Sequence, residues 1–213
     1  MVKFLIVRHG YSLSNKGGTF TGQLDIGLSE EGLKQAKLVS DYVLKNHKVD
    51  KIYSSDLSRA VDTIKAVAEK TGLEICPLKE FREAFCGEWE GLTVDVIKER
   101  YKEDYEGWIN GKANAHPTGG ESIEQIGERA LKKITEIAKE SEGKTVLIAT
   151  HGGVIKAMQR IWLKLPTEKL VEVPWVTNAS LSIVNYENGE FTIVKMGEDS
   201  YLGDMRTAMP KGI

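Results

Sequence analysis

The sequence predicts an α/β fold with a mainly parallel sheet, helices on both of its faces and an antiparallel edge. Three observations carry this prediction. Short apolar runs alternate with longer segments in which apolar residues recur at helical spacing. The last two runs are joined by Asn188-Gly189, a pair typical of a tight hairpin turn and therefore of antiparallel strands. Residues 81–120 differ in composition from the rest and predict a small cap insertion.

The composition is that of one globular domain spanning residues 1–213. Hydrophobic residues make up 41% of the chain and charged residues 28%, which is ordinary for such a domain. The formal net charge of −2 and the lack of a long basic run argue against a nucleic acid or a membrane as a partner. The apolar run at residues 4–7 is too short for a signal peptide or a membrane span. The oligomeric state stays open, with a homodimer as one option.

The first part of the chain predicts strand, helix, strand, helix and strand in that order. Ser29 is a suitable N-cap for the first helix, and Thr71-Gly72 is a typical end for the second. Each strand is a short run containing apolar residues, and each helix repeats apolar residues on one face. The expected elements are a strand at 3–7, a helix beginning after residue 29, a strand at 50–54, a helix from about residue 56 and a strand at 73–77.

The cap insertion at about 81–120 is rich in aromatic, charged and glycine residues. Its periodicity is weak, except for a predicted helix at 94–105. Long irregular segments in compact domains are often lids, so we expect it to cover a site. Regular alternation then resumes with a helix at 122–139, a strand at 145–149, a helix at 153–163 that ends before Pro166, and hairpin strands at 179–186 and 191–196.

The two cysteines, Cys76 and Cys86, predict free thiols in a reducing cytoplasm. They are too few for a disulfide scaffold and too far apart in sequence for a cysteine-based metal site. Each is expected to behave as a small hydrophobic residue.

Polar residues follow the predicted strands at the edge where ligands of open parallel sheets bind. Arg8 and His9 follow the first strand, and His151 follows the strand at 145–149. Arg59 lies in the first turn of the helix after the second strand. A guanidinium matches the oxygens of a phosphate, and the helix N-termini after Ser55 and His151 should direct N–H groups to the same region. The sequence therefore predicts an anion pocket.

A histidine within such a pocket is either another donor or a nucleophile. Neutral imidazole can attack phosphorus and form a phosphoramidate. Phosphoryl transfer needs little else from a protein beyond positioning and compensation of charge. Glycines follow both histidines, at Gly10 and at Gly152-Gly153, and we expect them to let the backbone approach a bound anion closely.

A general acid is also needed, because an alkoxide leaving group requires a proton. A carboxyl with a raised pKa suits this role and the later removal of a proton from water. Glu83 follows the third strand beside the aromatic insertion. Glu80, Glu88 and Glu90 are close in sequence, so spacing alone does not choose among the four.

Residues 5–15, LIVRHGYSLSN, resemble the L-x-R-H-G-x-[ST]-x-x-N signature of the histidine phosphatase superfamily, in its phosphoglycerate-mutase-like branch. Further blocks follow in the family's order and cover nearly the whole chain. They are FTGQLDIGLSEEGLKQA at 20–36, SSDLSRAVDT at 54–63, FREAFCGEWEG at 81–91, GGES at 119–122, THGG at 150–153 and NAS at 178–180.

The resemblance implies a three-layer α/β/α sandwich, no metal or other cofactor, and a small phosphate ester as the ligand. It makes His9 the phosphohistidine nucleophile and Glu83 the general acid and base. His151 would bind the phosphoryl group and donate toward the transition state. The other implied binding residues are Arg8, Asn15, Thr21, Gly22 and Arg59.

One position departs from the family pattern, because Tyr11 stands where many relatives carry an acidic residue. A bulky phenol there is expected to alter the pocket mouth and the choice of substrate. His47 matches no functional residue of the family. His116 lies in the cap just before the GGES block and is a lesser candidate for a substrate contact.

The favoured function is hydrolysis of a small phosphorylated metabolite, and the alternative is a cofactor-dependent phosphoglycerate mutase. A mutase must retain a bisphosphate and exclude water, which normally takes a larger and more basic cap. Here the cap is short, and its basic residues are balanced by acidic ones. A non-catalytic phosphate-binding module is disfavoured because His9, Glu83 and both arginines are present. The identity of the ester is not readable from the sequence.

Overall fold

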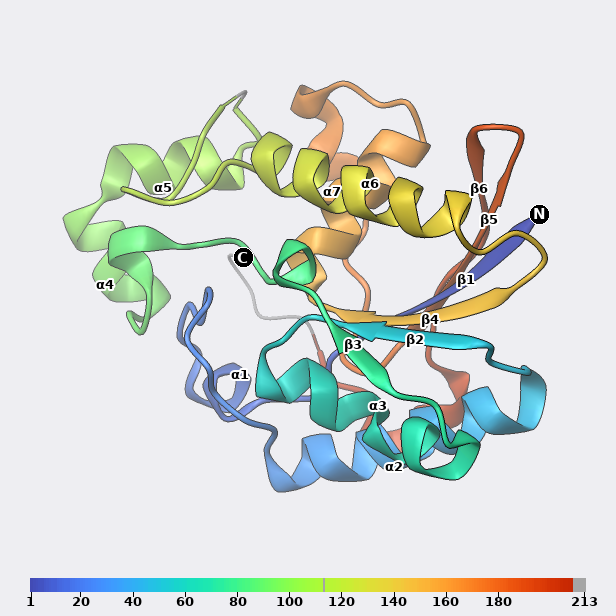
Figure 1. The fold of residues 1–213 in the computed structure, drawn as a ribbon. Coiled ribbons are helices and arrows are strands. Elements are labelled where there is room, and N and C mark those ends of the chain that lie inside the picture. Colours follow the sequence, from blue (N-terminus) through green and yellow to red (C-terminus); the bar gives the residue numbers. More distant parts are fainter. Residues whose placement is uncertain (113, 209–213) are drawn as a thin grey trace.

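The computed structural model describes residues 1–112 and 114–208. Ala113 and residues 209–213 of the predicted domain of 1–213 lie outside the described residues. A six-stranded sheet crosses the molecule in the order β3-β2-β4-β1-β5-β6 (Figure 1). The strands are β1 (Val2–Arg8), β2 (Lys51–Ser54), β3 (Ile75–Pro77), β4 (Thr145–Thr150), β5 (Leu181–Glu187) and β6 (Glu190–Glu198).

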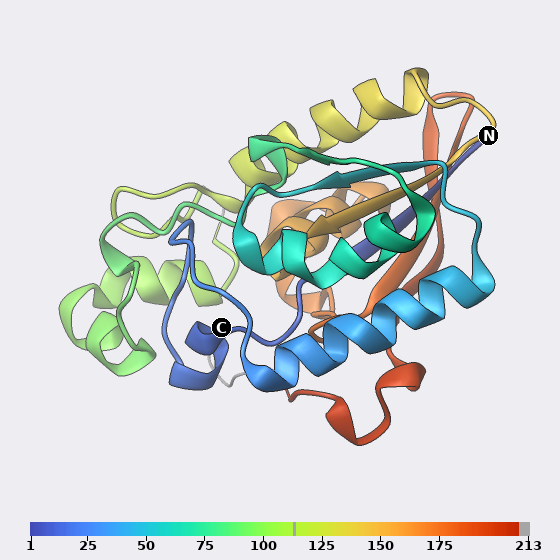
Figure 2. The same cartoon turned by 60° about the horizontal axis from the view of Figure 1, so that its bottom comes forward.

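Helices cover both faces of this sheet. Figures 1 and 2 show α6 and α7 on one face and α2 and α3 on the other, which confirms the predicted α/β/α layering. The α-helices are α1 (Leu13–Gly17), α2 (Glu30–Asn46), α3 (Ser58–Thr71), α4 (Val94–Arg100), α5 (Lys102–Ile109), α6 (Ile123–Lys139) and α7 (Gly152–Trp162). Short 3₁₀ helices are η1 (Lys79–Phe81), η2 (Gly87–Trp89), η3 (Thr167–Glu172) and η4 (Ser200–Met205). No helix of the described residues is long and apolar enough to cross a membrane.

The strand β1 is a continuous apolar run because both of its faces are buried. Phe4 and Ile6 pack in the cluster that includes residues of α6 and α7, and Leu5 and Val7 pack in the cluster that includes residues of α2 and α3. All four side chains have no exposed area. At about 25 cal/mol per Å² of apolar surface, such burial is the main source of stability for a strand of this kind.

The sheet register brings the polar strand ends together. β1 runs parallel to β4 with Arg8 opposite Thr150, and β2 runs parallel to β4 with Ser54 opposite Ala149. The carboxyl ends of these strands therefore meet at one edge. The hairpin of β5 and β6 supplies the predicted antiparallel edge, and it turns at Asn188-Gly189 with φ of 52° and 87°.

The single helix predicted at 94–105 was wrong, because the chain breaks at Tyr101 (φ −128°, ψ 41°) into α4 and α5. The break places aromatic side chains around one buried residue. The ring centroids of Tyr101, Tyr105 and Trp108 lie 6.5, 6.1 and 6.5 Å from that of Trp89. Packing around Trp89 therefore outweighs the local preference for a continuous helix.

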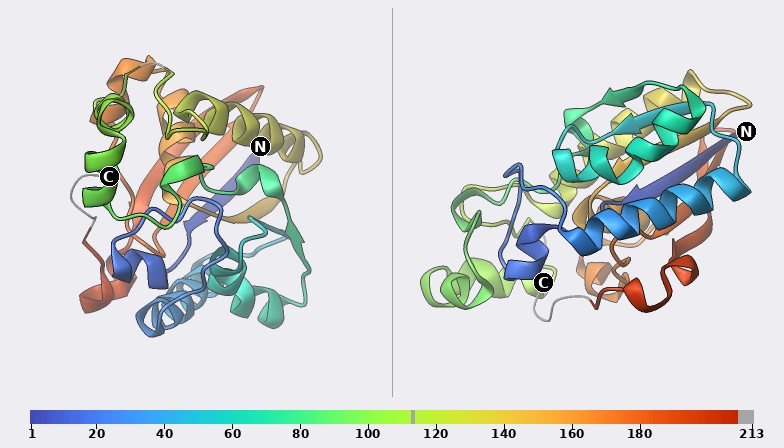
Figure 3. Two further views of the ribbon diagram at one scale, coloured as in Figure 1. Left: turned by 90° about the vertical axis from the view of Figure 1, so that its left-hand side faces the viewer. Right: turned by 90° about the horizontal axis from the view of Figure 1, so that it is seen from below.

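The segment that contains α4 and α5 lies at one end of the molecule, beside the chain around α1 (Figure 3). An isolated bridge between Thr19 and Thr93 joins these two parts of the chain. Neither α1 nor the 3₁₀ helices η3 and η4 were predicted from the sequence. These elements are too short for a hydrophobic period to show.

Candidate active site

His9 directly follows β1, and hydrogen bonds of its backbone groups fix its position. Its N–H donates to the carbonyl oxygen of Thr150 at 2.9 Å, and the side-chain amide of Asn178 donates to its carbonyl oxygen at 3.1 Å. On the ring, Nδ1 lies 2.7 Å from the carbonyl oxygen of Gly10. A carbonyl oxygen only accepts, so Nδ1 carries the proton and Nε2 keeps its lone pair.

The surroundings of His9 keep the imidazole neutral. The side chain is 5% exposed. Burial, followed by the positive charges of Arg59 and Arg8, lowers the pKa of His9 well below its usual value of 6.5. A neutral ring with a free lone pair is the form that can attack phosphorus.

The two arginines approach the pocket from β1 and α3. Nη1 of Arg8 donates to the carbonyl oxygen of Val176 at 2.6 Å, and burial lowers the pKa of Arg8 to about 10. Arg59 uses Nη1 and Nη2 to hold the carbonyl oxygens of Leu24 and Gly22, at 2.8 and 2.9 Å. Because a guanidinium has five N–H donors, Arg59 can anchor this loop and still bind an anion.

His151 is the N-cap residue of α7 and has no exposed surface. Its ring centroid lies 5.1 Å from that of His9, and its Nε2 lies 2.8 Å from the Ser55 hydroxyl. Burial and the charge of Arg59 lower its pKa well below 6.5, so the ring is neutral and carries one N–H. His151 is not among the residues that line the pocket.

Of the four candidate glutamates, only Glu83 lines the pocket. Its Oε1 accepts from the N–H of Ala84 at 2.9 Å, and its Oε2 accepts from the N–H of Gly153 at 3.1 Å. The others have different partners. Glu80 forms an ion pair with Lys133, Glu88 accepts from the Tyr101 hydroxyl, and Glu90 accepts from the N–H of Gln23.

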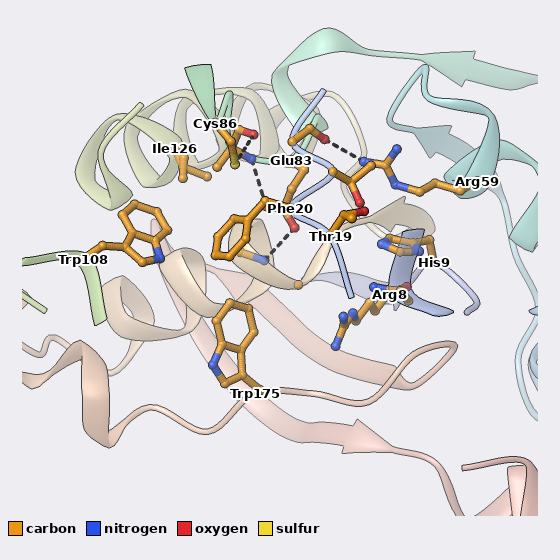
Figure 4. Close-up of a pocket in the computed structure, with 16 residues that line it drawn as sticks. Arg8, His9, Thr19, Phe20, Arg59, Glu83, Cys86, Trp108, Ile126 and Trp175 are labelled. Carbon is orange, nitrogen blue, oxygen red and sulfur yellow. Dashed lines mark hydrogen bonds between the residues drawn. The ribbon is translucent and has the colours of Figure 1, made fainter. Parts of the chain in front are cut away.

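The pocket has a volume of about 740 Å³ including its open mouth. Figure 4 shows that its two ends differ in character. His9, Arg8 and Arg59 lie at one end, and the rings of Trp108 and Trp175 lie at the other. The arrangement can bind a phosphoryl group at the polar end and an organic group at the apolar end.

Asn15, Thr21 and Gly22, which the family resemblance implies as binding residues, also line the pocket. Asn15 has a structural task as well, since its Oδ1 accepts from the N–H of Ser12 in a capping box at the start of α1 and from the amide of Asn178. Thr21 donates from its hydroxyl to that of Ser14. These bonds hold the loop before α2 against the end of β1.

Backbone groups at two of the positions expected to face an anion contact protein atoms. The N–H of Ser58 at the start of α3 donates to Asp25 at 2.8 Å, so this helix end is satisfied by a side chain. The glycines after the histidines make room for protein atoms. A Cβ on Gly10 would lie 2.8 Å from the carbonyl oxygen of Gly32, and one on Gly152 would lie 3.2 Å from the guanidinium of Arg8.

Tyr11, which was expected at the pocket mouth, and His116, a lesser candidate for a substrate contact, are not among the residues that line the pocket. Tyr11 is outside the lining residues, and its hydroxyl donates to the backbone oxygen of Asn15 at 3.3 Å. His116 is also outside them, with Nδ1 2.9 Å from the carbonyl oxygen of Pro117. The apolar end of the pocket is built instead by Phe20, Trp108, Ile126 and Trp175.

Several positioning residues were missed. The Thr63 hydroxyl accepts from the N–H of Gly10 at 2.9 Å and donates to the carbonyl oxygen of Arg59. Arg129 donates to the carbonyl oxygens of Glu80 and Glu83 at 2.7 and 3.0 Å. Thr63 lies within the SSDLSRAVDT block, which was a usable signal. Arg129 lies outside the blocks that resemble the family, within an ordinary amphipathic helix. No signal in the sequence therefore indicated its role.

Gly153 gives Glu83 its place, which leads to a test. A Cβ at residue 153 would clash with Oε1 of Glu83 and lie 3.2 Å from its Cδ. Gly153→Ala is therefore expected to displace the carboxylate and lower kcat about 10- to 100-fold, while the helix itself gains up to about 1 kcal/mol in stability. The measurements are steady-state kinetics and thermal unfolding.

Gly107→Ala is the matched control, because a Cβ there meets Ala115 at an ordinary 3.5 Å, away from the pocket. This variant should keep wild-type kinetics. If Gly153→Ala also keeps them, the position of Glu83 does not control the rate.

The residues described, 1–112 and 114–208, hold no group of three or more His, Cys, Asp or Glu side chains that could bind a metal ion.

Comparison with known proteins gives a consistent result. A sequence model described as histidine phosphatase superfamily (branch 1) matches residues 4–199. Phosphoserine phosphatase 1 of Hydrogenobacter thermophilus is 32% identical over 213 residues, which is 100% of both chains. A glucosyl-3-phosphoglycerate phosphatase of Mycobacterium tuberculosis is 33% identical over 186 residues, covering 84% of this chain and 82% of that protein.

A phosphoglycerate mutase and two solved structures are also similar. The 2,3-bisphosphoglycerate-dependent mutase of Parvibaculum lavamentivorans is 31% identical over 183 residues, covering 83% of this chain and 87% of the mutase. A Bacillus stearothermophilus protein superposes with a TM-score of 0.90 at 27% identity, covering 95% of this chain and 100% of that one. A mycobacterial glucosyl-3-phosphoglycerate phosphatase with VO3 superposes with a TM-score of 0.84 at 30% identity, covering 92% and 99%.

Proposed function

The chain belongs to the histidine phosphatase superfamily and is a phosphomonoester hydrolase, and we propose that it acts through a phosphohistidine on His9. One observation carries the assignment of His9. Its neutral imidazole has a free Nε2 and lines the same pocket as Arg8, Arg59 and the carboxylate of Glu83. Nucleophile, charge compensation and proton donor are thus all present around one cavity.

The reaction runs in two displacements. In the first, Nε2 of His9 attacks phosphorus, the bond to the ester oxygen breaks, and Glu83 gives its proton to the departing alcohol. In the second, Glu83 takes a proton from water, whose oxygen attacks the phosphoryl group and breaks the N–P bond. Inorganic phosphate leaves and both side chains are restored.

The remaining site residues compensate charge during these steps. Arg8 and Arg59 offer N–H donors to the equatorial oxygens of the transferring group. The neutral His151 adds its single N–H, and Asn15 adds its amide group from α1. These roles follow from position, since Arg8, Arg59 and Asn15 line the pocket and the ring centroid of His151 lies 5.1 Å from that of His9.

The composition of the pocket favours hydrolysis over mutase chemistry. Apart from Arg8 and Arg59, none of the described residues that line it is a lysine or arginine. A bisphosphate intermediate needs a second strongly cationic position within the same cavity, since its two phosphoryl groups exchange places. The apolar end formed by Trp108 and Trp175 suits an organic leaving group instead.

The proposed function is tested by supplying 3-phosphoglycerate with a trace of 2,3-bisphosphoglycerate. We expect release of inorganic phosphate to exceed formation of 2-phosphoglycerate. A phosphate assay measures the first quantity, and separation of the two phosphoglycerate isomers measures the second. Isomerisation at rates far above the rate of phosphate release would contradict the proposed phosphatase function and support the mutase function. Phosphate release is expected to stay unchanged in EDTA, because the proposed mechanism uses no metal.

The segment at 81–120 is proposed to act as the cap of this single domain, because it contributes Glu83, Cys86 and Trp108 to the pocket. A reducing cytoplasm is proposed as the compartment. Both Cys76 and Cys86 are free thiols, and burial raises the pKa of the Cys86 thiol, which keeps it unreactive.

A further inference from the structure

Lys156 is a buried cation that the proposed reaction does not use. It lies on α7 three residues after Gly153 and four after Gly152, both of which line the catalytic pocket. Residues at these spacings share one face of a helix, so Lys156 is about 4.5 Å further along the same face than Gly153. The side chain is 9% exposed.

No hydrogen bond or ion pair joins Lys156 to the residues that the structure describes, 1–112 and 114–208. Its one polar contact is with a π face, since Nζ lies 4.5 Å from the ring centroid of Trp175. Burial lowers the pKa of Lys156 to about 8, so most of these amines are protonated at neutral pH. A buried cation without an acidic partner costs free energy, and a single cation–π contact offsets only part of that cost.

Lys156 opens into a second cavity that adjoins the catalytic pocket. This cavity encloses about 490 Å³ including its mouth, and it shares the walls Trp108 and Trp175 with the catalytic pocket. Trp175 lies along the face of α7, because a Cβ on Gly152 would meet its ring at 3.2 Å while Lys156 faces its centroid. Among the described residues that line the cavity, the charged ones are Lys156 and the exposed Lys112.

The remaining walls of this second cavity are mostly apolar, and they include Ile123 and Leu170. Apolar walls strengthen the attraction between a lysine and an anion and raise the cost of dehydrating that anion. A single positive charge in such surroundings matches a singly charged, weakly hydrated group better than a phosphate dianion.

We propose that Lys156, between Trp108 and Trp175, forms a second substrate subsite that binds a carboxylate carried by the leaving-group alcohol. The proposal rests on the proposed function, because it assumes that the phosphoryl group of the ester occupies the polar end of the first pocket. It names the substrate class as phosphate monoesters of hydroxy acids, with the carboxylate reaching past Trp175 along α7.

The test compares esters that differ only in the distal carboxylate. The pairs are phosphoglycolate with ethyl phosphate, 3-phosphoglycerate with glycerol 3-phosphate, and 4-carboxyphenyl phosphate with phenyl phosphate, which span different distances from phosphorus. The quantity measured is the ratio of kcat/KM within each pair. We expect at least one pair to favour the carboxylate in the wild type and Lys156→Met to reduce that ratio about 10- to 100-fold, mainly through KM.

Lys132→Met is the matched control, because it removes one positive charge from the exposed part of α6, away from both cavities. Its ratios should stay within twofold of the wild type. Equal losses for both members of every pair in Lys156→Met would make Lys156 a packing residue and overturn the proposal. So would the absence of a carboxylate preference in the wild type.

A bisphosphate tests whether the second cavity binds a second phosphoryl group in place of a carboxylate. The ratio of kcat/KM for propane-1,3-diol bisphosphate to that for propyl phosphate should fall in Lys156→Met. We expect this fall to be smaller than that of the ratio for the carboxylate pair with the largest wild-type preference. A larger loss would overturn the carboxylate assignment. Phosphate release from phenyl phosphate by the wild type tests the proposed function separately, since this ester has no second anion. Thermal unfolding shows whether Lys156→Met folds, and removing an uncompensated buried charge should leave its Tm equal or higher.

Discussion

Replacing His9 by alanine should lower kcat for phosphate-ester hydrolysis by a factor on the order of 10⁴ or more, because loss of a covalent nucleophile removes the only route through the intermediate. Wild-type enzyme mixed with substrate and quenched in milliseconds should carry phosphate that is labile to acid and stable to base. His9→Ala should carry none. Binding of inorganic phosphate, followed by calorimetry, should persist because Arg8 and Arg59 remain.

His116→Ala provides the matched control for the loss of a histidine, since this exposed residue lies outside the pocket. It should keep wild-type turnover and the phosphoenzyme signal. A folded His9→Ala protein that still turns over substrate would show that another group attacks phosphorus. The nearest alternative is His151, 5.1 Å away between ring centroids.

Glu83→Gln should lower kcat about 10²- to 10⁴-fold for an alkyl phosphate, because the departing alkoxide then receives no proton. The effect should depend on the leaving group. p-Nitrophenolate leaves without a proton, so p-nitrophenyl phosphate should still phosphorylate His9 in the variant. Removal of the phosphoryl group needs Glu83 as a base, so a burst of one equivalent of p-nitrophenol should be followed by slow turnover.

Glutamine also changes the local hydrogen bonds, since it has one acceptor oxygen while Glu83 accepts from both Ala84 and Gly153. One of these N–H groups loses its partner, and thermal unfolding measures that cost. Glu80→Gln is the control, because Glu80 is paired with Lys133 outside the pocket. Equal losses of rate for alkyl and p-nitrophenyl phosphate in Glu83→Gln would argue that Glu83 only positions the substrate.

The elements with long apolar patterns were predictable from the sequence. The strand β1 and the helix α6 were expected within one residue at each end, and the start of α2 was expected directly after its N-cap Ser29. The break between α4 and α5 was not predictable. It depends on the packing of Tyr101 against Trp89, a contact between residues whose pairing no local pattern encodes.

The site was predictable where a chemical group directly follows a strand. His9 directly follows β1 and lines the pocket. Glu83 also lines it, but spacing alone left four glutamates open, and the choice of Glu83 came from the family resemblance. Trp175 and Lys156 could not be found in this way. Trp175 lies in a loop without periodicity, and Lys156 looks like an ordinary helix residue until the helix is placed against its neighbours.

The position of β1 in the sheet has a consequence for the synthesis of the protein. Of the six strands of the sheet, β1 is synthesised first, yet its partners are β4 (Thr145–Thr150) and β5 (Leu181–Glu187). At about 5–20 residues per second, those partners emerge many seconds later. Until then the growing chain has an apolar strand without neighbours and no catalytic histidine in place. Enzymatic competence therefore arises only after β5 has been synthesised, and until then β1 is an unpaired apolar strand that is exposed to aggregation.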